Sequence, residues 1–178
     1  MTEEKILTAE EIVKYFIDEF NTKIKDVKIK KRSAGLKKNE TTNIWIKIDK
    51  GAFKDIIKHL CALQFPHLSV ISGNDLVNSI ELIYHFTFNY GHRMSEIMLN
   101  LSVELPKPNP EIETICDYIP GALISEREKQ EFLGIKIIDI PDNKRLFLPE
   151  DFPEGVYPWR RDETGPEKLY RNLHEVKK

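Results

Sequence analysis

Cysteine is scarce in this chain: its 178 residues include only Cys61 and Cys116. Two distant thiols cannot supply the ligands of an iron–sulfur cluster or of a structural zinc site. The histidines show no ligand spacing either: His59, His67, His85, His92 and His174. Both cysteines fall on apolar stripes with helical spacing, so we expect buried free thiols. The sequence thus predicts no metal site and no cofactor within this chain.

Glycine is rare as well, with eight residues, and neither sign of charge is in excess. The stretch GNDLVNS, residues 73–79, has one glycine and does not match a phosphate-binding loop. The net charge of −2 creates no overall field that would attract nucleic acid. A basic stretch from Lys23 to Lys38 has almost no aromatic residues that could stack on bases. We expect no nucleic-acid partner and keep a nucleic-acid-binding α+β module as an alternative.

Long hydrophobic runs are missing. No stretch approaches the roughly 20 apolar residues that span a bilayer. The opening MTEEKILTAEEIVKY lacks the basic and apolar regions of a signal peptide. We therefore expect a cytoplasmic chain, or one peripheral to the cytoplasmic face of the cell membrane. Charged residues make up 31% of the sequence, and abundant Lys and Glu are typical of proteins from thermophiles.

Hydrophobic periodicity predicts elements in the order αββαβββαα. The expected helices are 9–20, 51–63, 111–118 and 122–133, and the expected strands are 27–32, 44–48, 67–73, 79–88 and 97–105. The two long strands should form an antiparallel pair, and SAGLKKNETT should be a polar loop. This order predicts an α+β fold with a mixed, mainly antiparallel sheet and helices on one face. Residues 1–139 would form a single domain, and 140–178 an extended Pro/Arg-rich C-terminal arm.

The last predicted helix carries Glu126, Arg127 and Glu128 in a row. At 100° per residue these charges point to three sides, and two of those sides carry apolar neighbours. A solvated surface is the simpler interpretation, and a helix held between its own sheet and another protein is the alternative. The two glutamates lie about 200° apart, so they cannot act together as a catalytic carboxylate pair. Since the sequence suggests no Ser–His–Asp or Cys–His pattern, we expect no catalytic residue.

An ordered motif follows from this helix into the C-terminal segment. Its members are Glu126, Arg127, Glu128, Glu131, Gly134, Asp142, Arg145, Pro149, Asp151, Pro158, Trp159, Arg160, Arg161 and Asp162. This order resembles the signature of the C subunit family of respiratory complex I (NADH dehydrogenase). The family includes the homologous subunit of membrane-bound, ferredoxin-linked nickel–iron hydrogenase and sulfane reductase complexes. Two departures, Ile140 in place of His or Lys and Trp159 in place of Leu, indicate a diverged branch.

The resemblance implies a structural subunit in the peripheral, electron-transferring arm of a membrane-bound oxidoreductase. Family members bind no cofactor and brace the large catalytic subunit. They also contact the small iron–sulfur subunit and the ferredoxin-like subunit, so iron–sulfur clusters, and nickel–iron in a hydrogenase, would belong to partners. Contact with the membrane would run only through partners. We favour an archaeal ferredoxin-linked hydrogenase or sulfane reductase, with the C subunit of an NADH/quinone-type complex I as the alternative.

The C-terminal segment suits a bracing role physically. Its prolines lower the entropy that an extended segment loses when a partner fixes it: Pro141, Pro149, Pro153, Pro158 and Pro166. Arginines can pair bidentately with carboxylates, and Tyr157 and Trp159 are candidate anchors. The simpler alternative is a disordered tail. We predict that this arm docks on partner subunits.

Overall fold

The structure, a computed structural model, describes residues 5–34, 36 and 39–169. Five strands form one sheet in the order β1-β2-β5-β4-β3. They are β1 (Ile24–Ala34), β2 (Asn39–Ile48), β3 (His67–Asp75), β4 (Ser79–Phe88) and β5 (Ile97–Pro106). Only β2 and β5 pair in parallel, and the other neighbours are antiparallel. The predicted mixed, mainly antiparallel sheet is therefore confirmed.

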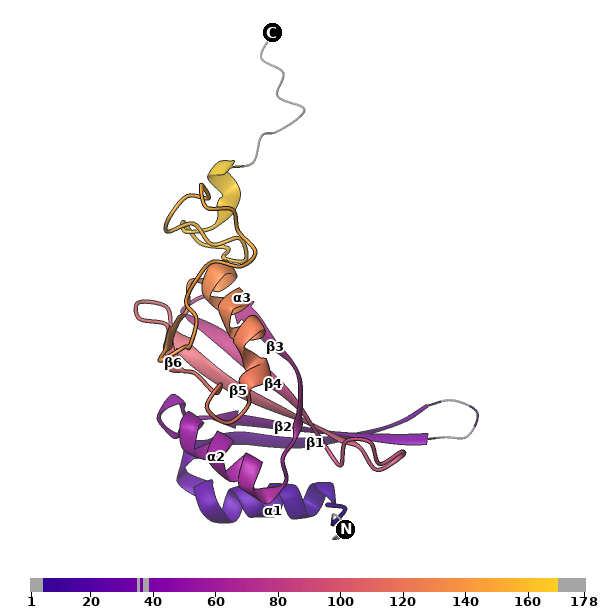
Figure 1. The fold of residues 1–178 in the computed structure, drawn as a ribbon. Helices are drawn as coiled ribbons and strands as arrows, with labels where there is room; N and C mark the ends of the chain where they lie inside the picture. Colours follow the sequence, from indigo (N-terminus) through magenta and orange to yellow (C-terminus); the bar gives the residue numbers. More distant parts are fainter. Residues whose placement is uncertain (1–4, 35, 37–38, 170–178) are drawn as a thin grey trace.

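Three α-helices cover one face of this sheet (Figure 1). They are α1 (Ala9–Phe20), α2 (Phe53–Leu63) and α3 (Leu123–Leu133), accompanied by the short 3-10 turns η1 (Asn21–Lys23), η2 (Lys50–Ala52), η3 (Pro120–Ala122) and η4 (Pro166–Leu169). The first helix begins at a capping box: Thr8 Oγ1 accepts from the amide of Glu11, and the Glu11 carboxylate accepts from the amide of Thr8. None of the described helices is both long and apolar enough to cross a bilayer.

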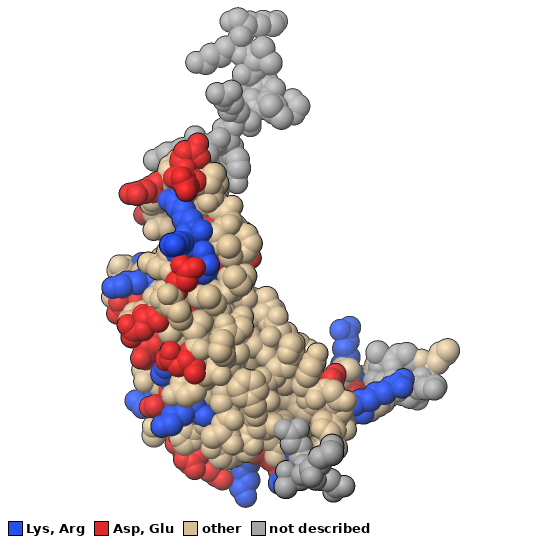
Figure 2. Space-filling model, viewed as in Figure 1, with Lys and Arg blue, Asp and Glu red and all other residues tan. Residues whose placement is uncertain are grey.

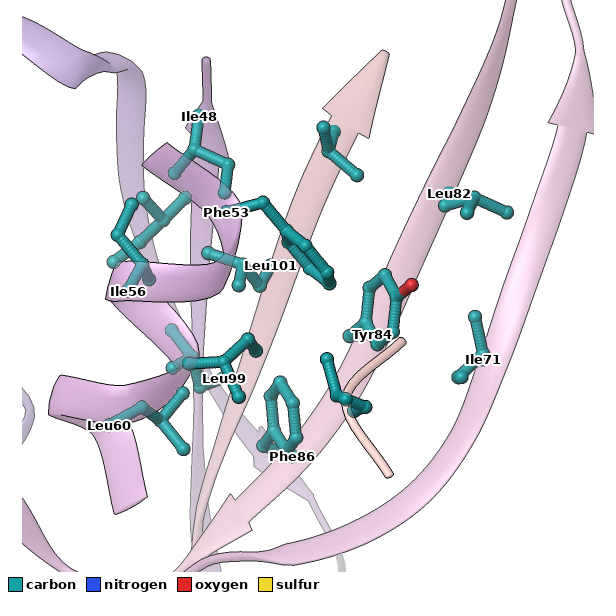
Figure 3. Close-up of a cluster of buried hydrophobic side chains, with 14 of the residues drawn as sticks. Ile48, Phe53, Ile56, Leu60, Ile71, Leu82, Tyr84, Phe86, Leu99 and Leu101 are labelled. Carbon is teal, nitrogen blue, oxygen red and sulfur yellow. The ribbon is translucent and has the colours of Figure 1, made fainter. Parts of the chain in front are cut away.

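The core lies between α2 and the central strands, as Figure 3 shows. Tyr84 of β4 stands opposite Leu101 of β5, and both are buried. Phe53 of α2 packs against Tyr84 with the ring centroids 4.9 Å apart. Because side chains alternate along a strand, the register that buries these residues turns their neighbours to the other face. The predicted pairing of the two long strands is confirmed.

Two sequence predictions about local structure are wrong. Residues 111–118 do not form a helix: β6 (Glu111–Glu113) pairs in parallel with β7 (Lys136–Ile138), and turns follow. Ile112 and Thr114 are buried while Glu113 is exposed, which is the alternation of a strand. The helix was predicted because Ile112 and Ile115 lie three positions apart in the sequence. That spacing fits a helix and also fits a short strand followed by a turn. The predicted loop SAGLKKNETT is shorter than expected, since β1 and β2 extend into it.

The structure also differs from the sequence predictions in the burial or location of individual side chains. Ile124 and Phe132 fall on one line of the predicted helix, so Ile124 should cover the sheet with it. Ile124 is instead 50% exposed, because Glu126 occupies the inward side of α3. Cys61 is only partly buried, whereas Cys116 is buried in a turn and not on a helix. After β7 the chain continues to Leu169 past α3 (Figure 1). Residues 170–178 lie outside the described part, and the division between domain and arm stays a prediction.

Candidate functional site

Helix α3 carries the first half of the predicted motif, and each of its charged side chains holds a different segment. The helix follows η3 and ends at Gly134, whose φ of 65° lies in the left-handed region that favours glycine. Glu126, Arg127 and Lys129 are all buried, which is unusual for charged residues without partners. Their partners therefore define what the helix does.

Glu126 ties α3 to the turn that follows β6. Its side chain is 1% exposed and accepts from the Thr114 hydroxyl at 2.5 Å and from the Ile115 amide at 2.9 Å. The Cys116 thiol lies 3.4 Å from the same carboxylate. Burial raises the pKa of Glu126, and these hydrogen bonds oppose the rise only in part. The carboxylate thus organises a buried turn through backbone and hydroxyl groups.

Replacing Glu126 by Gln should change how stability depends on pH. The folded-state pKa of Glu126 lies above its ordinary value of 4.5, so the proton binds more tightly to the folded chain. Glu126 therefore stabilises the folded chain at pH values below its pKa in the unfolded state. This contribution is lost as the pH rises through its pKa in the folded state. The melting temperature of Glu126→Gln, relative to wild type, should therefore increase from about pH 4 to about pH 8. Glu113→Gln on β6 is the control, and a constant difference for Glu126→Gln would contradict the burial described here.

Arg127 fixes the segment that follows β7. Its Nη1 donates to Asp142 Oδ2 at 3.0 Å, while Nε and Nη2 donate to the carbonyl of Lys144 at 2.9 and 2.6 Å. A further bond at 3.2 Å reaches the carbonyl of Arg145. The carboxylate partner of Arg127 therefore lies within the chain itself. Backbone carbonyls supply the other acceptors, as suits an irregular segment whose carbonyls are not paired in a helix or sheet.

Glu131 holds the same segment one turn further along α3. Its carboxylate accepts from three successive backbone amides, those of Leu146, Phe147 and Leu148. Arg145 then closes the next loop by donating to the carbonyls of Pro149 and Phe152, each at 3.0 Å. Charged side chains thus hold the backbone of residues 142–152 through hydrogen bonds.

The last turn of α3 carries an aromatic cluster. Trp159 stacks on Phe132 with centroids 4.7 Å apart, and its amide donates to the Phe132 carbonyl at 2.9 Å. The ring of Phe147 also contacts Phe132, with the two centroids 5.7 Å apart. Lys129 is buried beneath Trp159, with Nζ 4.7 Å from the indole centroid, and also pairs with Glu128. Phe147 and Trp159 remain 49% and 42% exposed, so this aromatic cluster presents apolar surface to solvent.

A second charged cluster joins β3 and β5 to the C-terminal segment. Lys107 pairs with Asp75 at 2.7 Å and with Asp162 at 2.9 Å. Arg160 is buried and donates through Nε to the Leu133 carbonyl at 2.7 Å. The amide of Arg161 donates to Asp75 at 2.7 Å.

The protonation states in this cluster follow from its hydrogen bonds. Bonds from Thr164 and Lys107 hold the pKa of Asp162 far below its usual range. Burial would lower the pKa of Lys107, but its bonds to Asp75 and Asp162 raise it. The directions of both shifts favour the charged forms of Lys107 and Asp162, the two partners of this ion pair.

The structure brings most of the predicted motif into one region around α3. The side chains of Arg145 and Arg160 donate to backbone carbonyls of this chain, and the backbone amide of Arg161 donates to the Asp75 carboxylate. The exposed motif side chains in this segment include those of Pro149, Asp151 and Arg161, whereas that of Pro158 is half-buried. The sequence reasoning missed Asp75, Lys107, Thr114 and Cys116, whose partners lie in other elements and have no local spacing signal. In the residues that the structure describes, no group of three metal-ligating side chains comes together.

Comparisons with known proteins agree with the resemblance. The family model for the respiratory-chain NADH dehydrogenase 30 Kd subunit matches residues 46–168. The chain is 34% identical over 131 residues to membrane-bound hydrogenase subunit beta of Pyrococcus furiosus, covering 72% of this chain and 75% of that protein. It is 36% identical over 130 residues to the C subunit of the F(420)H(2) dehydrogenase of Methanosarcina mazei, covering 71% and 79%.

A solved structure shares the fold. One chain of the membrane-bound sulfane sulfur reductase, an archaeal respiratory membrane complex, superposes with a TM-score of 0.70 at 20% identity, covering 95% of both chains. The sequence match runs from the end of β2 through β3, β4, β5 and α3 to the C-terminal segment as far as η4. The chain therefore belongs to the family of the 30 Kd subunit of respiratory-chain NADH dehydrogenase.

Proposed function

We propose that this chain is a non-catalytic accessory subunit in the peripheral, electron-transferring arm of a membrane-bound, multi-subunit oxidoreductase. It braces the large catalytic subunit and holds no cofactor. The observation that carries this proposal is the family match over residues 46–168. In addition, a relative that is 34% identical to this chain over 131 residues is a subunit of a membrane-bound hydrogenase. The complex reaches the membrane through its other subunits.

The structure supports bracing through the surface around α3. Buried charges fix residues 142–162 against the helix, so the exposed Phe147 and Trp159 are held in place before any partner arrives. Aromatic residues and arginines dominate the energetics of protein interfaces, and a fixed surface loses less entropy on binding. We assign this surface to contact with the large catalytic subunit, and adjoining parts of the arm to the small iron–sulfur and ferredoxin-like subunits.

The parent complex is most consistent with an archaeal ferredoxin-linked hydrogenase or sulfane reductase. The hydrogenase subunit of Pyrococcus furiosus is 34% identical to this chain. The departures Ile140 and Trp159 also separate this chain from the pattern of NADH-oxidising members. The C subunit of an NADH/quinone-type complex remains the alternative, because such subunits match this chain too, one of them 35% identical over 83 residues.

Purification from the native host through an affinity tag on this chain tests the proposal. We expect a large subunit and iron–sulfur subunits to co-purify from the membrane fraction, and cysteine pairs for nickel–iron ligation in the large subunit to identify a hydrogenase. The chain expressed alone should be colourless and metal-free by elemental analysis. Recovery without partners, or stoichiometric iron, nickel or flavin in the isolated folded chain, would refute the accessory role.

A further inference from the structure

The two edges of the main sheet differ sharply in charge. The β1 edge carries a run of charged residues: Lys25, Asp26, Lys28, Lys30, Lys31 and Arg32. The β3 edge has no Lys, Arg, Asp or Glu from His67 to Asn74, although 31% of the whole sequence is charged. Lysines on an edge strand discourage another chain from pairing with it. One edge of this sheet is therefore protected, and the other is left open.

The backbone of β3 is available on its outer side. Within the described part of the chain, residues 67–74 make backbone hydrogen bonds only to β4. A nine-residue strand with one unpaired side is long enough to align another strand. Figure 2 shows a broad area without Lys, Arg, Asp or Glu over this part of the molecule, whereas basic side chains gather over the β1–β2 hairpin.

Each end of β3 adjoins a hollow. At its start, a hollow of about 430 Å³ is lined by Phe65, Leu68, Tyr90 and Ile119 among others, and Phe65 and Tyr90 are 63% and 62% exposed. At its end, a hollow of about 760 Å³ lies between residues 73–76 and residues 158–161. A strand laid along β3 would run from one hollow to the other. The first is apolar enough to receive an apolar or aromatic side chain.

We propose that an extended, uncharged segment of a partner subunit pairs with β3 as a sixth strand of the sheet and places an apolar side chain in the hollow beside Phe65. The segment is uncharged because the apolar side chains of Leu68 and Val70 offer no partner to a charge placed beside them. The pairing rests on the proposed function, since the segment comes from another subunit of the same complex.

Hydrogen exchange by mass spectrometry compares the isolated chain with the purified complex. We expect amides on the outer side of β3 to exchange at least tenfold more slowly in the complex, while those of β1 keep their rate. A complex that contains its partners but leaves β3 unprotected would overturn the pairing and leave the proposed function standing. Failure to recover any partner with the wild-type chain would overturn both.

Substitutions at the edge give a second, independent measurement. Val70 is 44% exposed on β3, and Val70→Lys should reduce recovery of partner subunits per tagged chain at least fivefold, while Val70→Thr keeps it near wild type. Ile29→Lys, on the already basic β1 edge, is the matched control and should have little effect. Melting temperatures of the isolated variants identify any that fail to fold.

Other occupants of β3 give distinct results. Equal recovery with Val70→Lys and Val70→Thr would contradict the proposed strand. A wild-type chain that dimerises in solution and monomerises on Val70→Lys would assign the edge to a second copy of this chain and overturn the proposal. Protection of β3 in the isolated monomer that disappears on deletion of residues 170–178 would assign it to the chain's own end, with the same consequence.

Discussion

Replacing Arg127 by Met should release residues 142–148 from α3 while the sheet stays folded. The variant keeps a long apolar side chain but leaves the carbonyls of Lys144 and Arg145 and the carboxylate of Asp142 without their donor. Hydrogen bonds from a charged donor contribute about 1.5–3 kcal/mol each, although they do not add up fully. We expect the amides of Leu146 to Leu148 to exchange roughly 30- to 150-fold faster, which corresponds to about 2–3 kcal/mol of local stability.

The same variant tests whether the fixed segment serves assembly. Because Phe147 would no longer be held beside Phe132, recovery of the large subunit with the tagged chain should fall as well. Lys144→Met is the matched control: it removes a cation from the same segment and keeps the backbone carbonyl that Arg127 binds. Normal recovery of the large subunit with Arg127→Met, despite fast exchange, would show that the segment has no part in bracing.

Replacing Gly134 by Ala should destabilise the folded chain by roughly 2–5 kcal/mol. The left-handed backbone at Gly134 costs an alanine about 1–2 kcal/mol. A Cβ there would also overlap the ring of Tyr157, which must then move, at about 1–3 kcal/mol. Urea denaturation of the isolated chain measures the loss. Gly121→Ala is the control, because its Cβ would meet open space.

A double variant separates the two causes. In Gly134→Ala/Tyr157→Ala the steric overlap is gone and only the backbone strain at residue 134 remains. Adding Tyr157→Ala to Gly134→Ala should therefore lower the free energy of unfolding by less than Tyr157→Ala lowers it in the wild-type chain. A purely additive double variant would mean that Tyr157 does not pack on Gly134. Such a result would remove one of the contacts that hold the C-terminal segment against α3.

The sequence by itself determined the parts of the fold that depend on local pattern. Alternation along 79–88 and 97–105 decides which side chains face the helices, and a shift by one residue would turn Tyr84 and Leu101 to the other face together. Thr8 and Glu11 are close enough in sequence to mark the start of α1 without any other element. The charges of Glu126, Arg127 and Glu128 diverge for the same local reason, because helix geometry separates consecutive residues by 100°.

Tertiary structure alone decided which groups these charges meet. The parallel pairing of β2 with β5 and of β6 with β7 joins segments that the chain brings together only after folding. Arg161 binds Asp75 across 86 positions of sequence, and Glu126 binds the turn at Thr114 in place of the expected helix. No periodicity encodes such contacts, because a hydrogen bond between distant residues depends on where both backbones lie. A buried charge requires a partner, but the sequence left a solvated surface as the simpler interpretation of these charges. Only the fold shows that Glu126 and Arg127 are buried and where their partners lie.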